Sequence, residues 1–284
     1  MNLTSPSQVK DWCIANGFHP NKVLGQNFLV DRNSLDAIVA AAGDVAGQRV
    51  LEIGPGLGVL TEALLVAGAE VLAVEKDTRL AGRLSEALGN PSGLRVVAAD
   101  ALRVDWDELL QPGFCACVSN LPYSVGTRIL LDLAFRAGAP ERFVLLVQSE
   151  VAERFAAPEG SPHRGQAGVW LQLDYDISAI CQVPPTCFWP RPEVDSTVVR
   201  LDRHPCGLAA EERKRYFELT KLSFMHRRKQ LGALLRKAAG ALACSDAELS
   251  ERLKKCGLDP KIRPEELSVS QWESLATVYA AATT

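Results

Sequence analysis

The chain has 284 residues, 47% of them hydrophobic and 23% charged, which is enough for one large domain and a second, smaller one. The formal net charge of −3 at first argues against a nucleic-acid partner. No apolar run reaches the ~18 residues that a membrane span needs, and no charged segment followed by an apolar one predicts a signal peptide.

The cysteine pattern favours a reducing compartment. The chain has eight cysteines, none in a C-x-x-C pair, and several lie in apolar runs. This usage is typical of reduced, buried thiols, so we expect a cytoplasmic protein without a metal site.

The first 48 residues predict two helices separated by a loop. Pro6 precedes a short helix at 8–15, and Asp31 is a suitable N-cap for a helix that runs to Ala42. The segment 22–29 between them has no hydrophobic period and is expected to be a loop.

Strands and helices then alternate, and the strands are nearly continuous apolar runs. This pattern predicts a parallel sheet covered on both faces, a doubly wound Rossmann-like α/β fold. The expected strands are 49–53, 70–74, 94–98, 114–119 and 142–148, and the expected helices are 59–67, 78–88, a short turn at 106–109, 127–136 and 149–155.

The pattern changes after residue 155. Residues 176–183 and 197–202 read as two strands separated by a proline-rich segment, which predicts an antiparallel strand at the edge of the sheet. Residues 204–207 resemble a linker, and the remainder reads as helices at 209–224, 227–239, 245–255, 264–267 and 270–281. We therefore expect a mostly parallel sheet domain at 1–204 and a small all-α domain at 205–284.

Charge is distributed unevenly between these two parts. Residues 1–204 carry a net charge of −7, whereas residues 205–284 carry +4. Nine basic residues and one acid lie between Arg213 and Lys237, including the run Arg227-Arg228-Lys229. Such clustering indicates a phosphate-binding surface, although a solvated helix face is the alternative.

A glycine-rich segment follows the first strand of the alternating region. Gly54, Gly56 and Gly58 allow a sharp turn and close approach to a ligand, as in nucleotide-cofactor sites. Val59 stands where a dinucleotide fingerprint has its last glycine. The spacing, with Glu52 inside the strand, is closer to that of an S-adenosylmethionine methyltransferase. Glycines that serve only a tight turn are the alternative.

Acidic residues end the next two strands. A carboxylate at Glu75 suits the hydroxyls of a ribose, and one at Asp100 suits the amine of an adenine. Helix N-caps are the alternative role for acids at such positions.

The segment Asn120-Leu121-Pro122-Tyr123 ends the fourth strand. The Asn120 side-chain oxygen and the Leu121 carbonyl can accept hydrogen bonds from a planar amine, while Tyr123 can stack on its ring. Phe188 or Trp189, in a rigid proline-rich segment, could form the opposite wall. Together with the glycine segment, this set predicts a methyl acceptor held beside a methyl donor.

The order of these motifs resembles that of the small-subunit (16S) rRNA adenine N6,N6-dimethyltransferases of the KsgA/RsmA type. The resemblance covers nearly the whole chain and rests on the segments 24–29, 52–58, 120–123, 188–196 and 227–229. The chain departs from the family's usual residues at 124–126, at 164–169 and at His226.

The resemblance implies that S-adenosylmethionine is bound by Asn27, Leu29, Gly54, Glu75, Asp100 and Asn120, and that Asn120, Leu121, Tyr123 and Phe188 hold the target adenine. It also implies dimethylation of two adjacent adenines in the 3′-terminal hairpin loop of 16S rRNA, in an immature small ribosomal subunit. We expect a monomer, with the helical domain docking RNA.

Three other functions are compatible with parts of the pattern. One is an adenine N6-methyltransferase acting on large-subunit rRNA or DNA. Another is a noncatalytic rRNA-binding assembly factor that retains the pocket. A dehydrogenase is a further alternative, and the missing third dinucleotide glycine counts against it.

Overall fold

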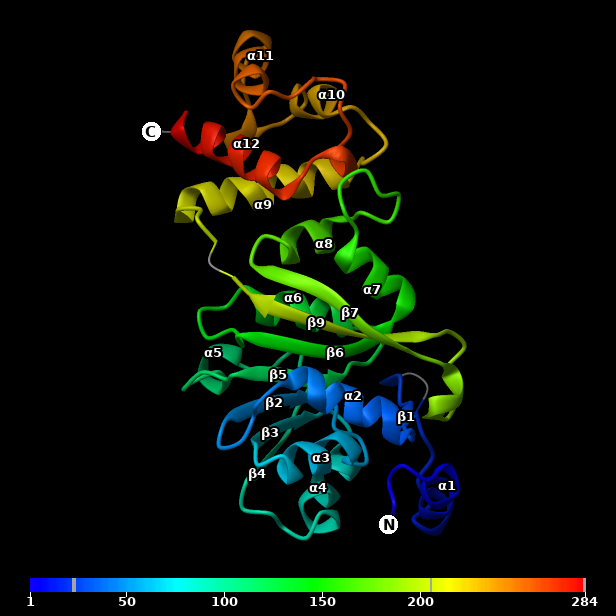
Figure 1. Ribbon diagram of the computed structural model, residues 1–284. Helices are drawn as coiled ribbons and strands as arrows, with labels where there is room; N and C mark the ends of the chain where they lie inside the picture. The colour runs from blue at the N-terminus through cyan, green and yellow to red at the C-terminus, as the bar shows by residue number, and fades with distance from the viewer. Residues whose placement is uncertain (22–23, 205, 283–284) are drawn as a thin grey trace. The chain divides into compact units, whose positions relative to one another are not determined.

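A computed structural model describes residues 1–21, 24–204 and 206–282 (Figure 1). Positions 22–23 of the expected loop and position 205 of the expected linker lie outside these residues. The described chain forms two compact units, one of residues 1–152 and 176–203, the other of residues 153–175 and 204–284. Among the described helices, none has both the length and the hydrophobicity required to cross a bilayer.

The first unit is built on a seven-stranded sheet with the order β4-β3-β2-β5-β6-β9-β7. The pairs β2–β3, β3–β4, β2–β5 and β5–β6 are parallel, and β9 is antiparallel to β6. The predicted doubly wound sheet and its antiparallel edge are therefore confirmed. The strands are β2 (Arg49–Ile53), β3 (Glu70–Glu75), β4 (Leu94–Ala98), β5 (Ala116–Asn120), β6 (Arg142–Gln148), β7 (Tyr175–Val183) and β9 (Ser196–Arg203).

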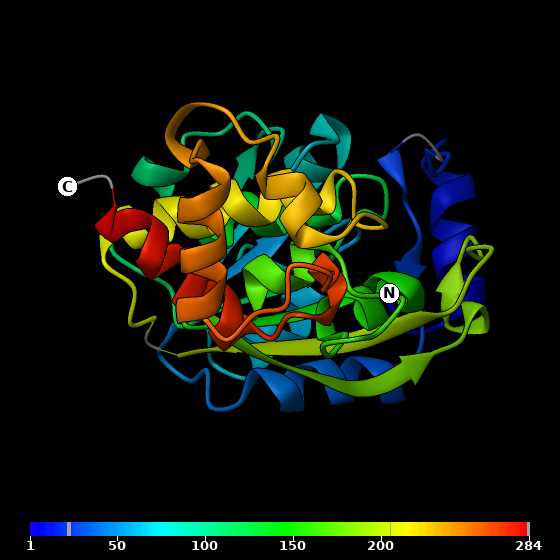
Figure 2. The same ribbon diagram turned by 90° about the horizontal axis from the view of Figure 1, so that it is seen from above.

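Helices cover both faces of this sheet. Buried side chains of α2, α3 and α4 share one core with inward-facing residues of the strands, among them Val50, Val118 and Leu146. Figure 1 shows α2 in front of the sheet and α6 behind it, and Figure 2 shows α2, in blue, along one face. The helices of this unit are α1 (Pro6–Ala15), α2 (Arg32–Ala42), α3 (Val59–Val66), α4 (Thr78–Ala87), α5 (Trp106–Leu109), α6 (Gly126–Ala134) and the start of α7 (Ser149–Ala156).

A second, two-stranded sheet joins segments far apart in the sequence. In β1 (Phe28–Leu29) and β8 (Phe188–Trp189), Phe28 pairs with Trp189 and Leu29 with Phe188 in antiparallel register. Residues 28–29 and 188–189 are too short to be recognised as strands from alternation, and we expected 28–29 to be part of a loop. It fixes the segment around Asn27 beside the proline-rich segment.

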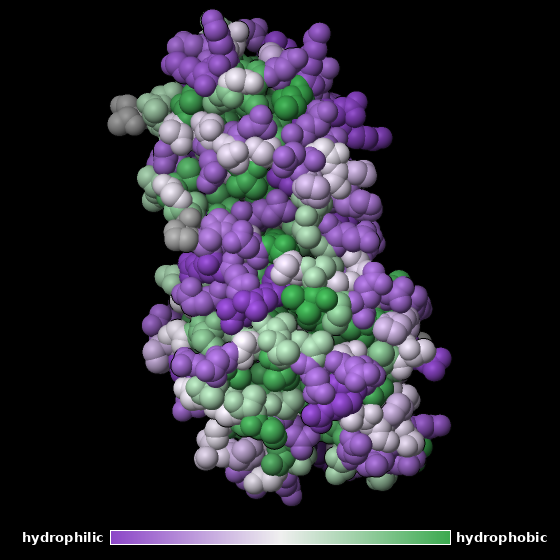
Figure 3. Space-filling model, viewed as in Figure 1, coloured by the Kyte–Doolittle hydropathy of each residue, from purple (hydrophilic) through white to green (hydrophobic). Residues whose placement is uncertain are grey.

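The second unit is helical and has its own core, which includes Tyr216, Leu219, Trp272 and Tyr279. Hydrophilic side chains cover much of the face of these helices drawn in Figure 3. Its helices are the end of α7, α8 (Gln166–Leu171), α9 (Ala210–Phe224), α10 (Leu231–Leu235), α11 (Asp246–Lys255) and α12 (Val269–Ala281), with short 3₁₀ turns at Gly240–Leu242 and Pro264–Glu266.

Two expectations for this unit differ from the structure. Residues 153–175 belong to the same compact unit as the C-terminal helices, whereas we expected them to belong to the sheet domain at 1–204. Tyr216 donates a hydrogen bond from its hydroxyl to the Val169 carbonyl at 2.8 Å, and Trp170 donates to Thr220 at 2.9 Å. These contacts join α8 to α9 across about 50 residues of sequence, which no local pattern reveals.

The expected helix at 227–239 is reduced to α10. The backbone N–H groups of Leu231 and Gly232 donate to the carbonyls of Ile262 and Pro260, outside the helix. A Cβ at Gly232 would lie 2.9 Å from the Pro260 carbonyl oxygen, so the backbone approaches that loop closely. These tertiary hydrogen bonds end any continuation of the helix toward residue 227.

The glycine segment makes a prediction about stability. Gly58 has φ +92°, and a Cβ there would lie 2.6 Å from Leu84 Cδ1, whereas a Cβ at Gly82, inside α4, meets nothing within 4 Å. We expect Gly58→Ala to lower the free energy of unfolding by about 1–3 kcal/mol and Gly82→Ala to raise it by about 0.5–1 kcal/mol. Urea unfolding of both variants tests this, and equal effects at the two positions would contradict it.

Candidate active site

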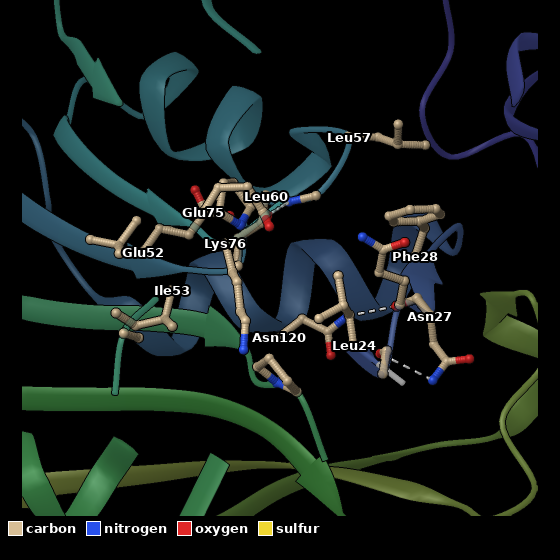
Figure 4. Close-up of a pocket in the computed structure, with 18 of the residues that line it drawn as sticks. Leu24, Asn27, Phe28, Glu52, Ile53, Leu57, Leu60, Glu75, Lys76 and Asn120 are labelled. Atoms are coloured by element: carbon tan, nitrogen blue, oxygen red, sulfur yellow. Dashed lines mark hydrogen bonds between the residues drawn. The ribbon is translucent and has the colours of Figure 1, made fainter. Parts of the chain in front are cut away.

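The ends of β2, β3, β4 and β5 open into one cavity of about 130 Å³ in the first unit. Parallel strands present their carboxyl ends at the same edge, and ligands of doubly wound folds bind there. Figure 4 shows side chains from the ends of β2, β3 and β5 and from the segment 24–28 around this cavity. Of the residues predicted to bind the donor, Asn27, Leu29, Gly54, Glu75, Asp100 and Asn120 all line it.

The glycine segment forms the turn that the sequence predicts. Gly54, Gly56 and Gly58 have φ values of +68°, +60° and +92°, which residues with a Cβ rarely adopt. A Cβ at Gly56 would lie 3.0 Å from the Phe28 ring, so this glycine also permits close approach. The backbone of the glycine segment therefore carries no side chains at the position where a cofactor would contact it.

Glu75 ends β3 and is bonded to the glycine segment. One of its carboxylate oxygens accepts the Gly56 N–H at 3.0 Å, and the other accepts the Asp77 N–H at 2.8 Å. Burial raises the pKa of Glu75, although these backbone donors oppose the shift. Each oxygen retains a second lone pair, so the carboxylate can still accept from ribose hydroxyls.

Asp100 follows β4 and is paired with Lys76, which we did not expect in the site from the sequence. Lys76 Nζ lies 2.9 Å from Asp100 Oδ2, and the Leu102 N–H donates to Asp100 Oδ1 at 3.0 Å. These partners lower the pKa of Asp100 and keep it ionised. Lys76 immediately follows Glu75 at the end of β3, and this position is the signal that could have identified it.

Asn120 ends β5 and is oriented by the segment before β1. Its amide nitrogen donates to the Asn27 carbonyl at 3.0 Å. A carbonyl can only accept, so this bond fixes the amide orientation and leaves Asn120 Oδ1 as an acceptor at the edge of the cavity. Gln26 binds the same segment to α4, because its amide donates to Asp77 Oδ2 at 3.1 Å.

The other residues predicted to contact the base lie outside this cavity. Leu121 and Tyr123 line a small hollow beside it, and the Tyr123 hydroxyl is 2.5 Å from Ser196 Oγ. Phe188 is only 2% exposed and packs in the main core. The structure thus places Leu121 and Tyr123 in a hollow next to the cavity that Asn120 lines, whereas the Phe188 side chain is buried in the core.

The residues present suit S-adenosylmethionine. The bare glycine turn gives room for a nucleoside and amino-acid moiety, and two strand-end carboxylates offer acceptors for hydroxyl and amine groups. The cavity also places Asn120 Oδ1 beside this set. A donor bound there would have its reactive end in the same cavity as Asn120.

Glu52 differs from the other acids of the site because it is 1% exposed. Thr61 donates to Glu52 Oε2 at 2.7 Å, yet burial dominates and raises the pKa of Glu52 to about 8. The folded protein therefore keeps this carboxyl protonated at neutral pH, while the unfolded chain ionises above its ordinary pKa near 4.5.

This difference predicts how stability depends on pH. Between about pH 4.5 and 8 the folded state retains a proton that the unfolded state loses, so Glu52 costs stability as pH rises, by up to about 1.4 kcal/mol per pH unit. Glu52→Gln removes this cost and keeps an acceptor for Thr61. Its melting temperature should exceed that of the unaltered protein increasingly from pH 5 to pH 8, and a constant or shrinking gap would contradict a protonated Glu52.

Comparison with known proteins agrees with this geometry. The family model for ribosomal RNA adenine dimethylase matches residues 17–280. A protein of Kineococcus radiotolerans named ribosomal RNA small subunit methyltransferase A is 39% identical over 97% of this chain and 91% of its own.

Solved structures share the fold. A dimethyladenosine transferase from Plasmodium falciparum superposes with a TM-score of 0.76 at 23% identity, over 87% of this chain and 95% of that one. The 23S rRNA methyltransferase ErmE superposes with a TM-score of 0.69 at 28% identity, over 89% of this chain and 99% of its own. The resemblance inferred from the motifs is confirmed. Because the family model spans most of the chain and a close relative covers nearly all of it, the chain belongs to the ribosomal RNA adenine dimethylase family.

Proposed function

We propose that this chain dimethylates the N6 amines of two adjacent adenines in the 3′-terminal hairpin loop of 16S rRNA, in an immature small ribosomal subunit. Like the other members of its family, it is an rRNA adenine dimethyltransferase that uses S-adenosylmethionine. The observation that carries the proposal is the oriented Asn120 amide, whose free acceptor lies in one cavity with the glycine segment and the strand-end acids.

Donor binding would fall to the residues that line the cavity. Glu75 would accept from the ribose hydroxyls and Asp100 from the adenine amine, with the bare backbone at Gly54 against the donor. Asn27 and Leu29 would close the site from the N-terminal side. Leu29 is 2% exposed and held in β1, so its part is to fix the position of this segment.

Acceptor binding would fall to the segment after β5. S-adenosylmethionine supplies an electrophilic methyl group on a sulfonium. Asn120 Oδ1 and the Leu121 carbonyl, together called the amine clamp, would accept the two N–H groups of the adenine amine. These hydrogen bonds favour the pyramidal nitrogen that attacks. No general base is needed, because the proton can leave after transfer. Positioning and preorganised acceptors then supply most of the rate.

The aromatic residues would hold the base itself. Tyr123 would stack on adenine, a contact worth about 1–3 kcal/mol. Its hydroxyl is held near Ser196 Oγ, so its ring is already ordered. Phe188 could form the opposite wall only after it is uncovered, because the side chain is 2% exposed.

The helical unit would dock the RNA. Arg227, Arg228 and Lys229 are exposed in the turn between α9 and α10. Two other members of the basic cluster serve the unit internally. Arg213 is paired with Asp174, and Arg215, which is 2% exposed, is paired with Glu211 and Glu218. The phosphate-binding surface is therefore smaller than the count of cations suggests.

We further infer that the protein acts as a monomer in the cytoplasm. One copy of the chain supplies every residue of the cavity. The eight cysteines are unpaired, as expected in a reducing compartment where ribosomes assemble.

The likeness to ErmE supports a second candidate, a methyltransferase for large-subunit rRNA. The two candidates share the chemistry and differ in the RNA. Transfer of labelled methyl groups to purified immature 30S particles, 50S particles and duplex DNA separates them. Label confined to 16S rRNA supports our proposal, and label in 23S rRNA or DNA would replace it.

Asn120→Ala tests the amine clamp. The variant loses an acceptor that acts on the reacting nitrogen, so we expect the single-turnover rate on immature 30S particles to fall by at least about 100-fold. The fold should persist, as judged by circular dichroism. Asn33→Ala, on the exposed face of α2, is the matched control and should leave the rate unchanged. Near-normal methyl transfer by the Asn120 variant would contradict the proposed role of Asn120 in the reaction.

The exposed cations predict a salt dependence. A double variant, Arg228→Ala with Lys229→Ala, should weaken binding to 16S rRNA and reduce the slope of log affinity against log salt by about 1 for each lost phosphate contact. Lys254→Ala, an exposed cation of α11, is the control. Filter binding between 50 and 200 mM salt gives the slopes, and an unchanged slope in the double variant would remove this turn from the RNA surface.

A further inference from the structure

One buried hydroxyl joins the two halves of the active site. Ser119 Oγ accepts the Ile53 N–H at 2.8 Å and donates to the Ile53 carbonyl at 2.6 Å. Ser119 is fully buried, with 0% exposure. A single side chain of β5 thus satisfies both backbone polar groups of one residue of β2.

This bridge replaces ordinary strand pairing. Among the described residues, the β2–β5 register covers Val50 with Ala116 and Leu51 with Cys117, whereas β2 remains paired with β3 as far as Ile53. In a parallel sheet the N–H and C=O of one residue point to the same neighbouring strand. Where the ladder between β2 and β5 stops, both groups of Ile53 would be buried without partners, and the serine hydroxyl supplies a donor and an acceptor together.

The bridge lies between the two binding segments. Ile53 immediately precedes Gly54, where the glycine turn begins, and Ser119 immediately precedes Asn120. The Gly54 N–H donates to the Val74 carbonyl of β3, which pairs with β2 on the side opposite β5. The Asn120 amide donates to the Asn27 carbonyl. Of these contacts, the Ser119 bridge is the one that connects the glycine turn directly to the strand carrying the amine clamp.

We propose that Ser119 is a positioning residue that sets the separation between the donor-binding turn and Asn120. The proposal rests on the function proposed above. Alanine at this position would leave the Ile53 N–H and C=O unsatisfied, and the ends of β2 and β5 would shift to regain partners. Such a shift alters the turn that receives the donor and its distance from the clamp together.

Ser119→Ala is the direct test, in the full-length protein. Calorimetric titration with S-adenosylmethionine, without RNA, should give a Kd about tenfold higher, the equivalent of one hydrogen bond. The single-turnover rate at saturating donor should fall by about 10- to 100-fold, because misplacement persists after binding. Ser119→Cys keeps the shape with a weaker donor and acceptor, so its Kd and rate should lie between those of serine and alanine.

Thr220→Val is the matched control. Thr220 is also 0% exposed, and its hydroxyl donates to the Tyr216 carbonyl at 2.6 Å and accepts from Trp170 at 2.9 Å, in the helical unit. Thr220→Val should lower the melting temperature about as much as Ser119→Ala does. Its Kd for S-adenosylmethionine should stay within about twofold of the value for the unaltered protein.

A purely structural role would give a different result. If Ser119→Ala loses only melting temperature, with donor Kd and saturated rate within about twofold of the unaltered protein, the positioning role is overturned. If that variant does not fold, an unchanged Kd and rate in Ser119→Cys overturns it instead. The titration needs no RNA, so the role of Ser119 is decided even if the unaltered protein fails to methylate 16S rRNA.

Discussion

The active site depends on the reversal of strand order between β2 and β5. After β2 the chain adds β3 and β4 on one side of the sheet and then returns to place β5 on the other side. Neighbouring strands at such a point send their following loops in opposite directions, which opens a crevice at the carboxyl edge. The glycine turn follows β2, and Asn120 ends β5, so donor and acceptor segments flank this crevice because of topology.

The acids around this crevice are in different environments. Burial keeps Glu52 protonated, while Lys76 keeps Asp100 ionised, and Glu75 is held between burial and two backbone N–H donors. One site therefore offers a neutral carboxyl inside the sheet and an anion at its rim. This difference in protonation avoids three adjacent negative charges in a buried position, which would destabilise the folded protein.

Much of this site is predictable because its signals are local. Glycine spacing, acids at strand ends and the Asn120 segment are each read within a few residues, and the parallel sheet then brings them to one edge. The bounds of β2, β4 and β6 agree with the expected ranges for the same reason.

The remaining features depend on contacts across the fold. Pairing of β1 with β8, the Lys76–Asp100 ion pair and the Ser119 bridge each join segments that the sequence does not mark as neighbours. Arg164 is a further case. This departure from the family's usual residue is 1% exposed and donates to the Ala157 carbonyl at 2.7 Å. It belongs to the interior of the helical unit, where no local pattern would place an arginine.

The most direct test is the position of the methyl groups on the RNA. Primer extension on 16S rRNA from immature 30S particles, treated with S-adenosylmethionine and with or without the protein, reads N6,N6-dimethyladenine as a stop. We predict stops at two adjacent adenines of the 3′-terminal hairpin loop, present only with the protein. Donor consumption with stops elsewhere in 16S rRNA, or no stops at all, would contradict it.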